Sequence, residues 1–245
     1  MSDASPAPEV SIRELHTMEQ VAAAADVISE VWGGDKTGMP ANLLQALAHS
    51  GNYAVGLYLD RPGADGPGGE RMIGASVAFF AAPAERSMHS HITGVLAPYR
   101  SLGLGRLLKQ HQRQWAFARD VGHITWTFDP LIARNAHFNL RVLGARVTEY
   151  LVDHYGAMDD VVNRGDESDR LMASWALAAP ASPPREEDIV TTVEVPPDIE
   201  RIRREQPGEA LDWRYRVREA FEGLMQDGFV VGGFDADRGY LFVRA

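Results

Sequence analysis

Residues 90–108, which read SHITGVLAPYRSLGLGRLL, constrain the fold of this chain more than any other stretch. A β-type run ends at Pro98, a turn with Gly103 and Gly105 follows, and a helix begins. The first turn of a helix leaves backbone N–H groups without partners, and the helix dipole places about half a positive charge there. The glycines let an anion approach the main chain, and Arg100 adds a cation. The stretch therefore predicts an anion site.

Spacing separates three kinds of phosphate-binding turn. A Walker loop needs Gly, four residues and then Gly-Lys-Ser/Thr, and the chain has no such run. A Rossmann turn needs a third glycine where Leu108 stands, although Asp129 after the next strand suits its ribose-binding acid. The third pattern is Arg100-x-x-Gly103-x-Gly105. It resembles the Gln/Arg-x-x-Gly-x-Gly/Ala pyrophosphate loop of the GNAT (GCN5-related N-acetyltransferase) superfamily.

Composition narrows the class of protein. The 245 residues carry a net charge of −10 and no cysteine. The negative charge argues against a nucleic-acid partner, whose phosphates are neutralised on binding, and the lack of cysteine excludes disulfides and thiolate metal sites. No apolar run reaches the roughly 18 residues of a membrane span, and no basic-then-apolar signal opens the chain. We expect a cytoplasmic protein with no metal site, no nucleic acid and no membrane as partner.

Apolar periodicity and turn residues predict an alternation of strands and helices. Strands are expected at residues 10–15, 53–59, 72–80, 88–96, 123–128, 145–155 and 171–177, and helices at 18–31, 40–49, from 104 for about 17 residues, and at 133–143. The helix from 104 is expected to bury a stripe that includes Leu107 and the core histidine His111, and to turn Lys109 away from it. Residues 60–69 are expected to form a flexible turn.

A linker and a C-terminal extension complete the expected organisation. We expect a disordered N-terminus at 1–9, a main domain at 10–178, a proline-rich linker at 179–188 and a small α/β extension at 189–245. The extension is predicted to contain a strand, two helices and a hairpin. Arginines and acids alternate between residues 201 and 218, which indicates solvated helix faces with i,i+4 pairs rather than a basic patch.

The same order of elements resembles the GNAT fold over residues 10–178. The resemblance is strongest from His89 to Tyr155, where residues 126–131 (WTFDPL), 134–139 (RNAHFN) and 143–145 (LGA) are similar to an uncharacterised branch of predicted acetyltransferases. That branch also has a C-terminal extension. The resemblance implies a mixed α/β (α+β) fold with a mostly antiparallel sheet flanked by helices.

The resemblance further implies acetyl-CoA, or another acyl-CoA, as cofactor. Pantetheine would then pair with the main chain at Val95, Leu96 and Ala97. The pyrophosphate would lie on the amides of the turn, which comprises Arg100, Ser101, Leu102, Gly103, Leu104 and Gly105, with Arg106 at the helix start. Asn135 stands where many relatives contact coenzyme A, and Phe138 is expected to line the thiol channel.

Two histidines are candidates for the general base. The position eleven residues before Arg100 carries a glutamate base in some GNAT proteins, and here it is His89. His91 lies two residues further, so alternation in a strand places both side chains on one face. Imidazole titrates near pH 6.5, which suits a base at neutral pH. The alternative for each is a hydrogen-bonded histidine without a catalytic role.

Two other positions bear on the chemistry. Asp129, at the carboxyl end of a strand, could hold the ammonium group of a substrate, and its alternative role is to cap the turn before Pro130. Many GNAT proteins protonate the leaving thiolate with a tyrosine at the position of Leu140. Here Tyr155, His137 or a water molecule would have to protonate the thiolate, or the thiolate leaves without an acid.

The leading hypothesis is an acyl-CoA-dependent N-acyltransferase in which a small-molecule amine such as an amino acid attacks the thioester directly. Succinyl-CoA is an alternative acyl donor. A non-catalytic module that binds acyl-CoA is the second hypothesis, because the usual tyrosine is missing, and a dinucleotide-dependent oxidoreductase is the third. The C-terminal extension would cover the acceptor cleft or form the contact of a homodimer.

Overall fold

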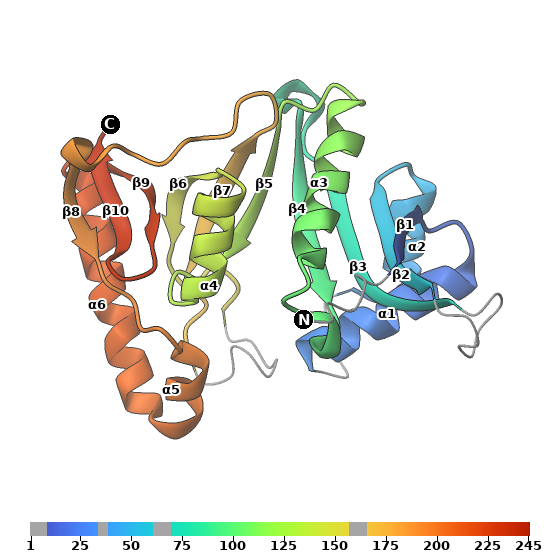
Figure 1. Cartoon of the computed structure of the whole chain (residues 1–245), viewed down its shortest axis with the longest axis horizontal. Coiled ribbons are helices and arrows are strands. Elements are labelled where there is room, and N and C mark those ends of the chain that lie inside the picture. The colour runs from blue at the N-terminus through green and yellow to red at the C-terminus, as the bar shows by residue number, and fades with distance from the viewer. Residues whose placement is uncertain (1–8, 34–38, 61–69, 157–165) are drawn as a thin grey trace, which may run out of the picture. The chain divides into compact units, whose positions relative to one another are not determined.

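A computed structural model describes residues 9–33, 39–60, 70–156 and 166–245. The chain divides into two compact units, Met1–Asp120 and Val121–Ala245. Both units combine antiparallel strands with helices, as the ribbon in Figure 1 shows. Of the turn expected at 60–69, Asp60 is the last residue of a strand and residues 61–69 lie outside the described part of the chain, as do residues 1–8 of the N-terminus expected to be disordered at 1–9.

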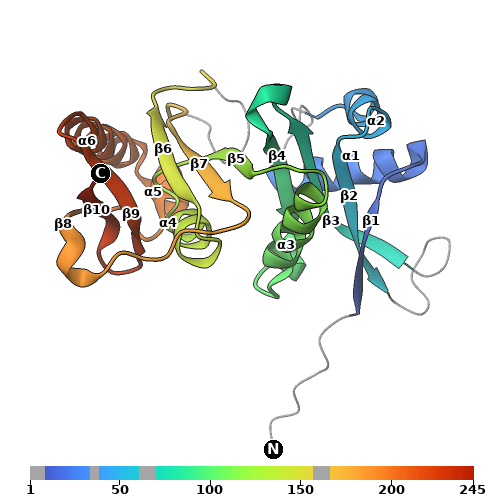
Figure 2. The ribbon, with the colours of Figure 1, turned by 90° about the horizontal axis from the view of Figure 1, so that it is seen from above.

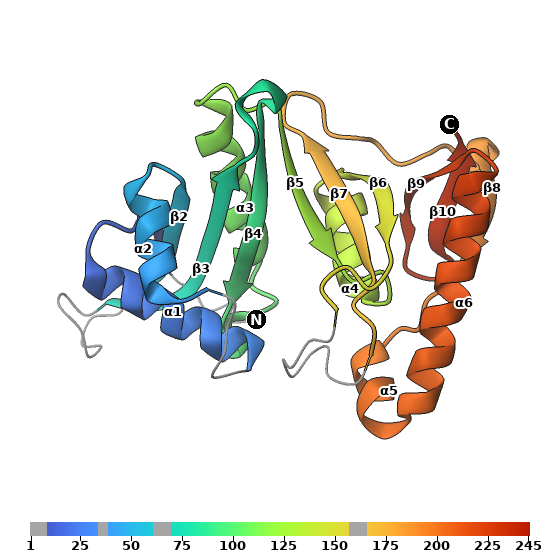
Figure 3. The same ribbon diagram turned by 180° about the vertical axis from the view of Figure 1, so that it is seen from behind.

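The first unit contains four neighbouring antiparallel strands in the spatial order β1-β2-β3-β4. Helix α3 covers one face of these strands, while α1 and α2 cover the other, as the front and rear views show (Figures 1 and 3). Its elements are β1 (Val10–Glu14), α1 (Met18–Trp32), α2 (Ala41–His49), β2 (Tyr53–Asp60), β3 (Glu70–Phe80), β4 (Ser87–Val95) and α3 (Leu104–Phe117).

Local chemistry sets the ends of α1. The Thr17 side chain accepts a hydrogen bond from the Gln20 amide, and the Gln20 side chain accepts one from the Thr17 amide, which is a capping box. Gly33 ends the helix with φ 72°, in the left-handed region that favours glycine. Between these caps, Val21 and Ile28 lie on the stripe that packs into the core of the unit.

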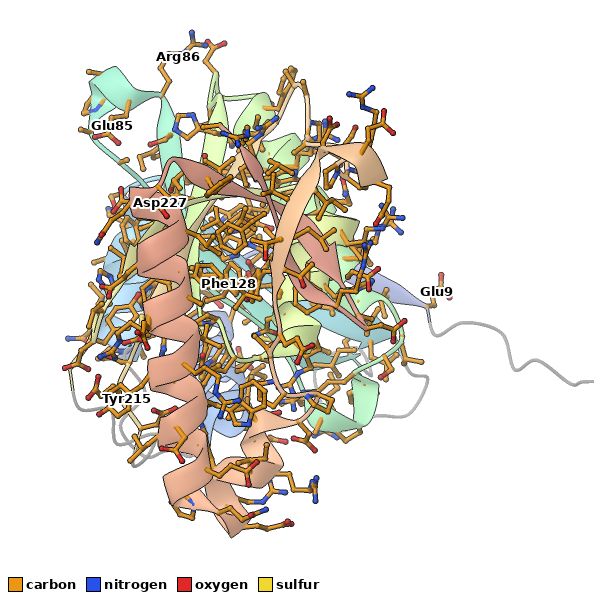
Figure 4. The ribbon with its side chains drawn as sticks, turned by 90° about the vertical axis from the view of Figure 1, so that its left-hand side faces the viewer. Glu9, Glu85, Arg86, Phe128, Tyr215 and Asp227 are labelled. Carbon is orange, nitrogen blue, oxygen red and sulfur yellow. The ribbon has the colours of Figure 1, made fainter. Side chains whose placement is uncertain are left out.

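The second unit contains two antiparallel sheets, in the orders β5-β7-β6 and β8-β10-β9. The long helix α6 is seen best from behind and from the side, where Tyr215 marks its outer face and Asp227 its end (Figures 3 and 4). The elements are β5 (His123–Phe128), α4 (Ala133–Ala136), a π-helical segment (His137–Val142), β6 (Arg146–Leu151), β7 (Arg170–Ala176), β8 (Ile189–Val193), α5 (Ile199–Glu205), α6 (Pro207–Gln226), β9 (Phe229–Asp235) and β10 (Gly239–Arg244).

The predicted fold class is confirmed: the fold is a mixed α/β one with a mostly antiparallel sheet flanked by helices and a small C-terminal sheet. The compact units, however, divide after Asp120, so the extension shares a unit with residues 121–178. The division at the 179–188 linker stays a prediction. No helix in the described ranges has both the length and the hydropathy needed to cross a membrane.

Helix α3 differs from its prediction in two respects. It ends at Phe117, because Asp120 takes φ 58° and the backbone leaves the helical region before Gly122. Its buried face also differs, because Lys109 is 5% exposed whereas Leu107 is 42% exposed. The buried positions Leu104, Leu108 and Gln112 recur every four residues, so Lys109 lies at the border of the buried stripe and Leu107 outside it. Figure 2 gives the view from above, in which α3 is seen almost end-on.

Candidate functional site

Strand β4 carries a bulge at the position of the candidate base. In the β3–β4 ladder Val77 pairs with Ile92 and the next residue, Ala78, pairs with Ser90. His91 is therefore the extra residue of a β-bulge. A bulge bends the strand and changes the direction of the side chains around it.

His89 and His91 lie together, as the alternation predicted. Both rings contact Phe79 of β3, at centroid distances of 5.3 and 6.0 Å, and the two imidazoles lie 6.4 Å apart. The surroundings of His91 lower its pKa below the ordinary value of 6.5 by burial, although part of the side chain stays exposed. His91 is therefore neutral at pH 7, as a general base must be.

The chain after β4 uses some of its polar groups internally. The Leu96 amide donates to the Ile73 carbonyl at 2.9 Å, and the Val95 carbonyl accepts from Arg100 Nε at 3.2 Å. The Arg100 amide donates to the carbonyl of Ala97 at 3.2 Å. The Leu96 amide and the carbonyls of Val95 and Ala97 therefore have partners within the chain, and Arg100 is held against the end of β4. The pairing of a cofactor with the main chain at residues 95–97 stays a prediction.

The start of α3 is open. Gly103 is the N-cap residue with φ 75°, a conformation that favours glycine, and no side chain in the described part of the chain caps the helix. The first helical hydrogen bond runs from the Leu107 amide to the Gly103 carbonyl, at 3.1 Å. The amides of Leu104, Gly105 and Arg106 precede it, so they have no helical acceptor.

Space lies beside this helix start. A Cβ atom at Gly103 or at Gly105 would meet no described atom within 4 Å. Ser101, Leu102 and Arg106 are exposed around the same turn, and Ser101 also has a positive φ of 69°. Amides without a helical acceptor, the positive helix end and an exposed guanidinium together form the kind of site that binds phosphate. The residues fit the diphosphate of a coenzyme A.

Two predicted cofactor residues belong to the second unit. Asn135 is in α4 and Phe138 in the π-helical segment, and both are half-buried. Leu140 is 6% exposed in the same segment, so the position expected for an acidic tyrosine is apolar and buried. Tyr155 is exposed, and its hydroxyl shares a hydrogen bond with Thr127 Oγ1 at 2.8 Å.

The carboxylate of Asp129 is bonded to groups of this chain. Its Oδ1 accepts from Arg214 at 3.0 Å, its Oδ2 accepts from Arg203 at 2.6 Å, and Oδ1 also accepts from the Leu131 amide at 2.9 Å. The carboxylate is 4% exposed. These contacts support the turn-capping alternative, because both oxygens of the Asp129 carboxylate are bonded to groups of this chain and neither is left for the ammonium group of a substrate.

Asp129 is one member of a larger buried ion cluster. Asp166 bonds to the same two guanidinium groups, accepting from Arg203 at 2.7 Å and from Arg214 at 2.7 Å. Beside it, Arg218 donates to Asp169 at 2.6 Å. The cluster joins α5 and α6 to the end of β5 and to the residues just before β7.

The cluster corrects one sequence prediction. Arg203, Arg214 and Arg218 are not on solvated helix faces, because buried carboxylates hold them, although Arg201 does form the expected i,i+4 pair with Glu205. Residues 168–170, which lie beside the cluster, are buried as well. One signal was available in the sequence: Ala210, Arg214, Val217 and Phe221 are spaced as one helical stripe, which places an arginine on the apolar face.

Comparison with known proteins supports the fold. No family model matches the chain, and no curated protein matches it by sequence. An acetyltransferase of the GNAT family from Streptococcus pneumoniae has a TM-score of 0.53 at 14% identity, covering 69% of this chain and 99% of its own. The ribosomal-protein-S18-alanine N-acetyltransferase from Escherichia coli has a TM-score of 0.52 at 15% identity, and the match covers 73% of this chain and 97% of that one.

Arabidopsis thaliana Naa50, solved with the bisubstrate analogue CoA-Ac-MVNAL, has a TM-score of 0.52 at 15% identity and covers 68% of this chain and 98% of its own. At these identities the likeness concerns the fold. The chain has the fold of the GNAT acetyltransferases, as the motifs at 90–108 and 126–145 predicted.

The ion cluster predicts how stability depends on pH. Burial by itself raises the pKa of Asp129, but Arg214 and Arg203 beside it hold that pKa well below its ordinary value. In the unfolded chain the carboxyl titrates near pH 4, so the unfolded state takes up its proton first as the pH falls. Asp129 therefore stabilises the native state above about pH 4, and this contribution is lost below that pH.

We expect Asp129→Asn to lower the free energy of unfolding at pH 7 by about 3–5 kcal/mol, because two buried guanidinium groups lose a charged partner. Its stability should also fall less steeply than that of the wild type below about pH 4. Urea denaturation between pH 3 and 7 measures both. Asp188→Asn, which disrupts an exposed pair with Arg185, is the control and should change little. Wild-type stability in Asp129→Asn would contradict the assignment.

Proposed function

We propose that this protein is an N-acyltransferase that transfers the acyl group of acetyl-CoA, or of another acyl-CoA, to a small-molecule amine such as an amino acid. The observation that carries the proposal is the open start of α3, where Gly103 is left-handed and the amides of the first helical turn have no helical acceptor, one short loop after the bulged strand β4. The GNAT fold supports it. So do fold neighbours solved with coenzyme A or an analogue of it, which include the NatC complex and Naa50.

Different residues would bind the cofactor and carry out the proton transfer. Amides of Leu104, Gly105 and Arg106 would hold the diphosphate, and the exposed Arg106 guanidinium would add charge. Acyl-CoA supplies the thioester, an acyl group bound to a good leaving thiolate. His91 accepts the proton of the substrate ammonium, so that the free amine can form the C–N bond as the C–S bond breaks. His89 is the second candidate for this base.

The fate of the leaving thiolate separates two functions. Leu140 is buried and apolar, so no acid stands at the position of the usual tyrosine. Transfer then relies on the low basicity of a thiolate, or on Tyr155 or His137. The same feature favours a second candidate function, a non-catalytic module that binds acyl-CoA. Tight binding of acetyl-CoA without release of thiol over a broad panel of amines would support that module.

Gly105 offers a clean test of cofactor binding. It lies in the first turn of α3 with open space beside it, so Gly105→Ala and Gly105→Glu should both fold. We expect Ala to retain the affinity for coenzyme A and Glu to weaken it by about tenfold or more, since a carboxylate would face the diphosphate. Gly103→Glu should weaken binding as well, but it is a less clean test, because the φ of 75° at this position adds backbone strain to any residue other than glycine.

Isothermal titration with coenzyme A, acetyl-CoA and succinyl-CoA measures the affinity and compares the acyl donors, with NADH as the control for a dinucleotide site. Equal affinities for the Ala and Glu variants would show that the start of α3 is not the diphosphate site. Absence of heat with every coenzyme A derivative, or heat with NADH instead, would overturn the proposal.

The base predicts a pH profile. Because burial lowers the pKa of His91, the wild-type kcat/KM should stay constant at neutral pH and decline only below about pH 6.5, where the imidazole becomes protonated. His91→Ala should reduce turnover at pH 7 by about 100-fold while coenzyme A affinity is retained. His49→Gln, at the exposed end of α2, is the control. An unchanged profile in His91→Ala, with loss of activity in His89→Gln, would transfer the role to His89.

A further inference from the structure

A chain of polar side chains lies buried between α3 and strands β3 and β4. Lys109 Nζ donates to Ser90 Oγ at 2.7 Å and to Gln112 Oε1 at 3.2 Å. Gln112 Nε2 donates to Ser76 Oγ at 3.4 Å. The hydroxyls of Ser76 and Thr93 share a hydrogen bond at 2.8 Å. The five side chains form one connected network within the first unit.

This network stands where apolar side chains would be expected. Lys109, Gln112, Ser76 and Ser90 are each at most 5% exposed. Burial of an amine disfavours its charged form, and it lowers the pKa of Lys109 to about 7. An apolar side chain at position 109 would fill the same space without this cost. The chain has only two lysines, Lys36 and Lys109, among its 24 lysines and arginines.

The two ends of the network enclose the bulge. Ser90 is the residue before His91, and Thr93 follows Ile92, so the anchored hydroxyls flank the place where the ladder skips a residue. A strand can shift its register by one residue there, which would move side chains to the opposite face. The hydrogen bond from Lys109 to Ser90 on one flank, and the link from Gln112 through Ser76 to Thr93 on the other, oppose such a shift.

We propose that Lys109 is a positioning residue for acyl transfer: through Ser90 on one flank, and through Gln112, Ser76 and Thr93 on the other, it fixes the β4 bulge that directs His91. This inference rests on the proposed function for the chemistry, but the contacts it invokes are in the fold itself. Lys109 acts on the strand and does not touch the reacting atoms.

The experiment compares Lys109→Met, Ser90→Ala and the double variant with the wild type. Methionine has the length of the lysine stem but cannot hydrogen-bond. Amide hydrogen exchange at residues 90–93 reports the bulge whether or not the protein is active. Turnover, the KM for acyl-CoA and coenzyme A affinity are measured on the same samples. Gln110→Met, the next position on α3, is the control.

For Lys109→Met we expect amide exchange at residues 90–93 to accelerate by about tenfold or more, because the anchored flank opens locally. We expect kcat to fall by about tenfold or more, since small displacements of a catalytic group are costly. The KM for acyl-CoA and the affinity for coenzyme A should stay at wild-type values, because the start of α3 is untouched. Gln110→Met should match the wild type.

Non-additivity identifies the route. If Lys109 acts through Ser90, the double variant should lose no more kcat than the more affected single variant. Wild-type exchange at residues 90–93 in Lys109→Met, or additive losses in the double variant, would overturn the inference. If Lys109→Met does not fold, Ser90→Ala, which deletes one hydroxyl, is the decisive variant. Amide exchange at residues 90–93 must then be faster in Ser90→Ala than in the wild type for the inference to stand. A wild type that neither binds coenzyme A nor turns over would instead overturn the proposed function.

Discussion

The first turn of α3 presents main-chain amides that the helix cannot satisfy, and the candidate functional residues of the first unit are arranged around this constraint. Gly103 must take a left-handed conformation to start the helix there, and Arg100 is fixed on the Val95 carbonyl just before it. Strand β4 leads into the same turn and carries His91 on its bulge. Because strand, turn and helix are one continuous segment, the register of β4 sets the position of the candidate base relative to the candidate phosphate site.

Buried charge serves different purposes in the two units. In the second unit, Asp129 and Asp166 each contact two guanidinium groups, so desolvation is offset by direct pairing and the C-terminal helices are tied to the strand ends. In the first unit, Lys109 is buried against neutral hydroxyl and amide groups, and burial lowers its pKa. Burial raises the free energy of the charged form in both units. The paired ion cluster of the second unit suits a role in stability. The Lys109 amine of the first unit, held by neutral groups, suits a role in fixing the position of a strand.

The candidate residues also limit which groups could act as base and acid in acyl transfer. His91 has a partly exposed side chain and a pKa lowered by burial, which suit a general base, whereas both oxygens of Asp129 accept hydrogen bonds from arginines. Leu140 provides no proton for the leaving thiolate. An enzyme of this kind would depend on deprotonating the amine and on binding the thioester in place, since a thiolate leaves without acid assistance more easily than an alkoxide or an amide.

The sequence by itself determined the order of strands and helices, the glycine turn and the pairing of His89 with His91 on one face, because hydrophobic period, caps and alternation are local properties. It also predicted the fold class through motifs at 90–108 and 126–145. Only the tertiary structure decided that Lys109 is buried, that β4 has a bulge at His91 and that Asp129 belongs to an ion cluster. These features depend on contacts between residues far apart in the chain, as between Asp129 and Arg214. From the sequence alone a charged residue is predicted to be exposed to solvent, because the partner that would allow its burial is not known.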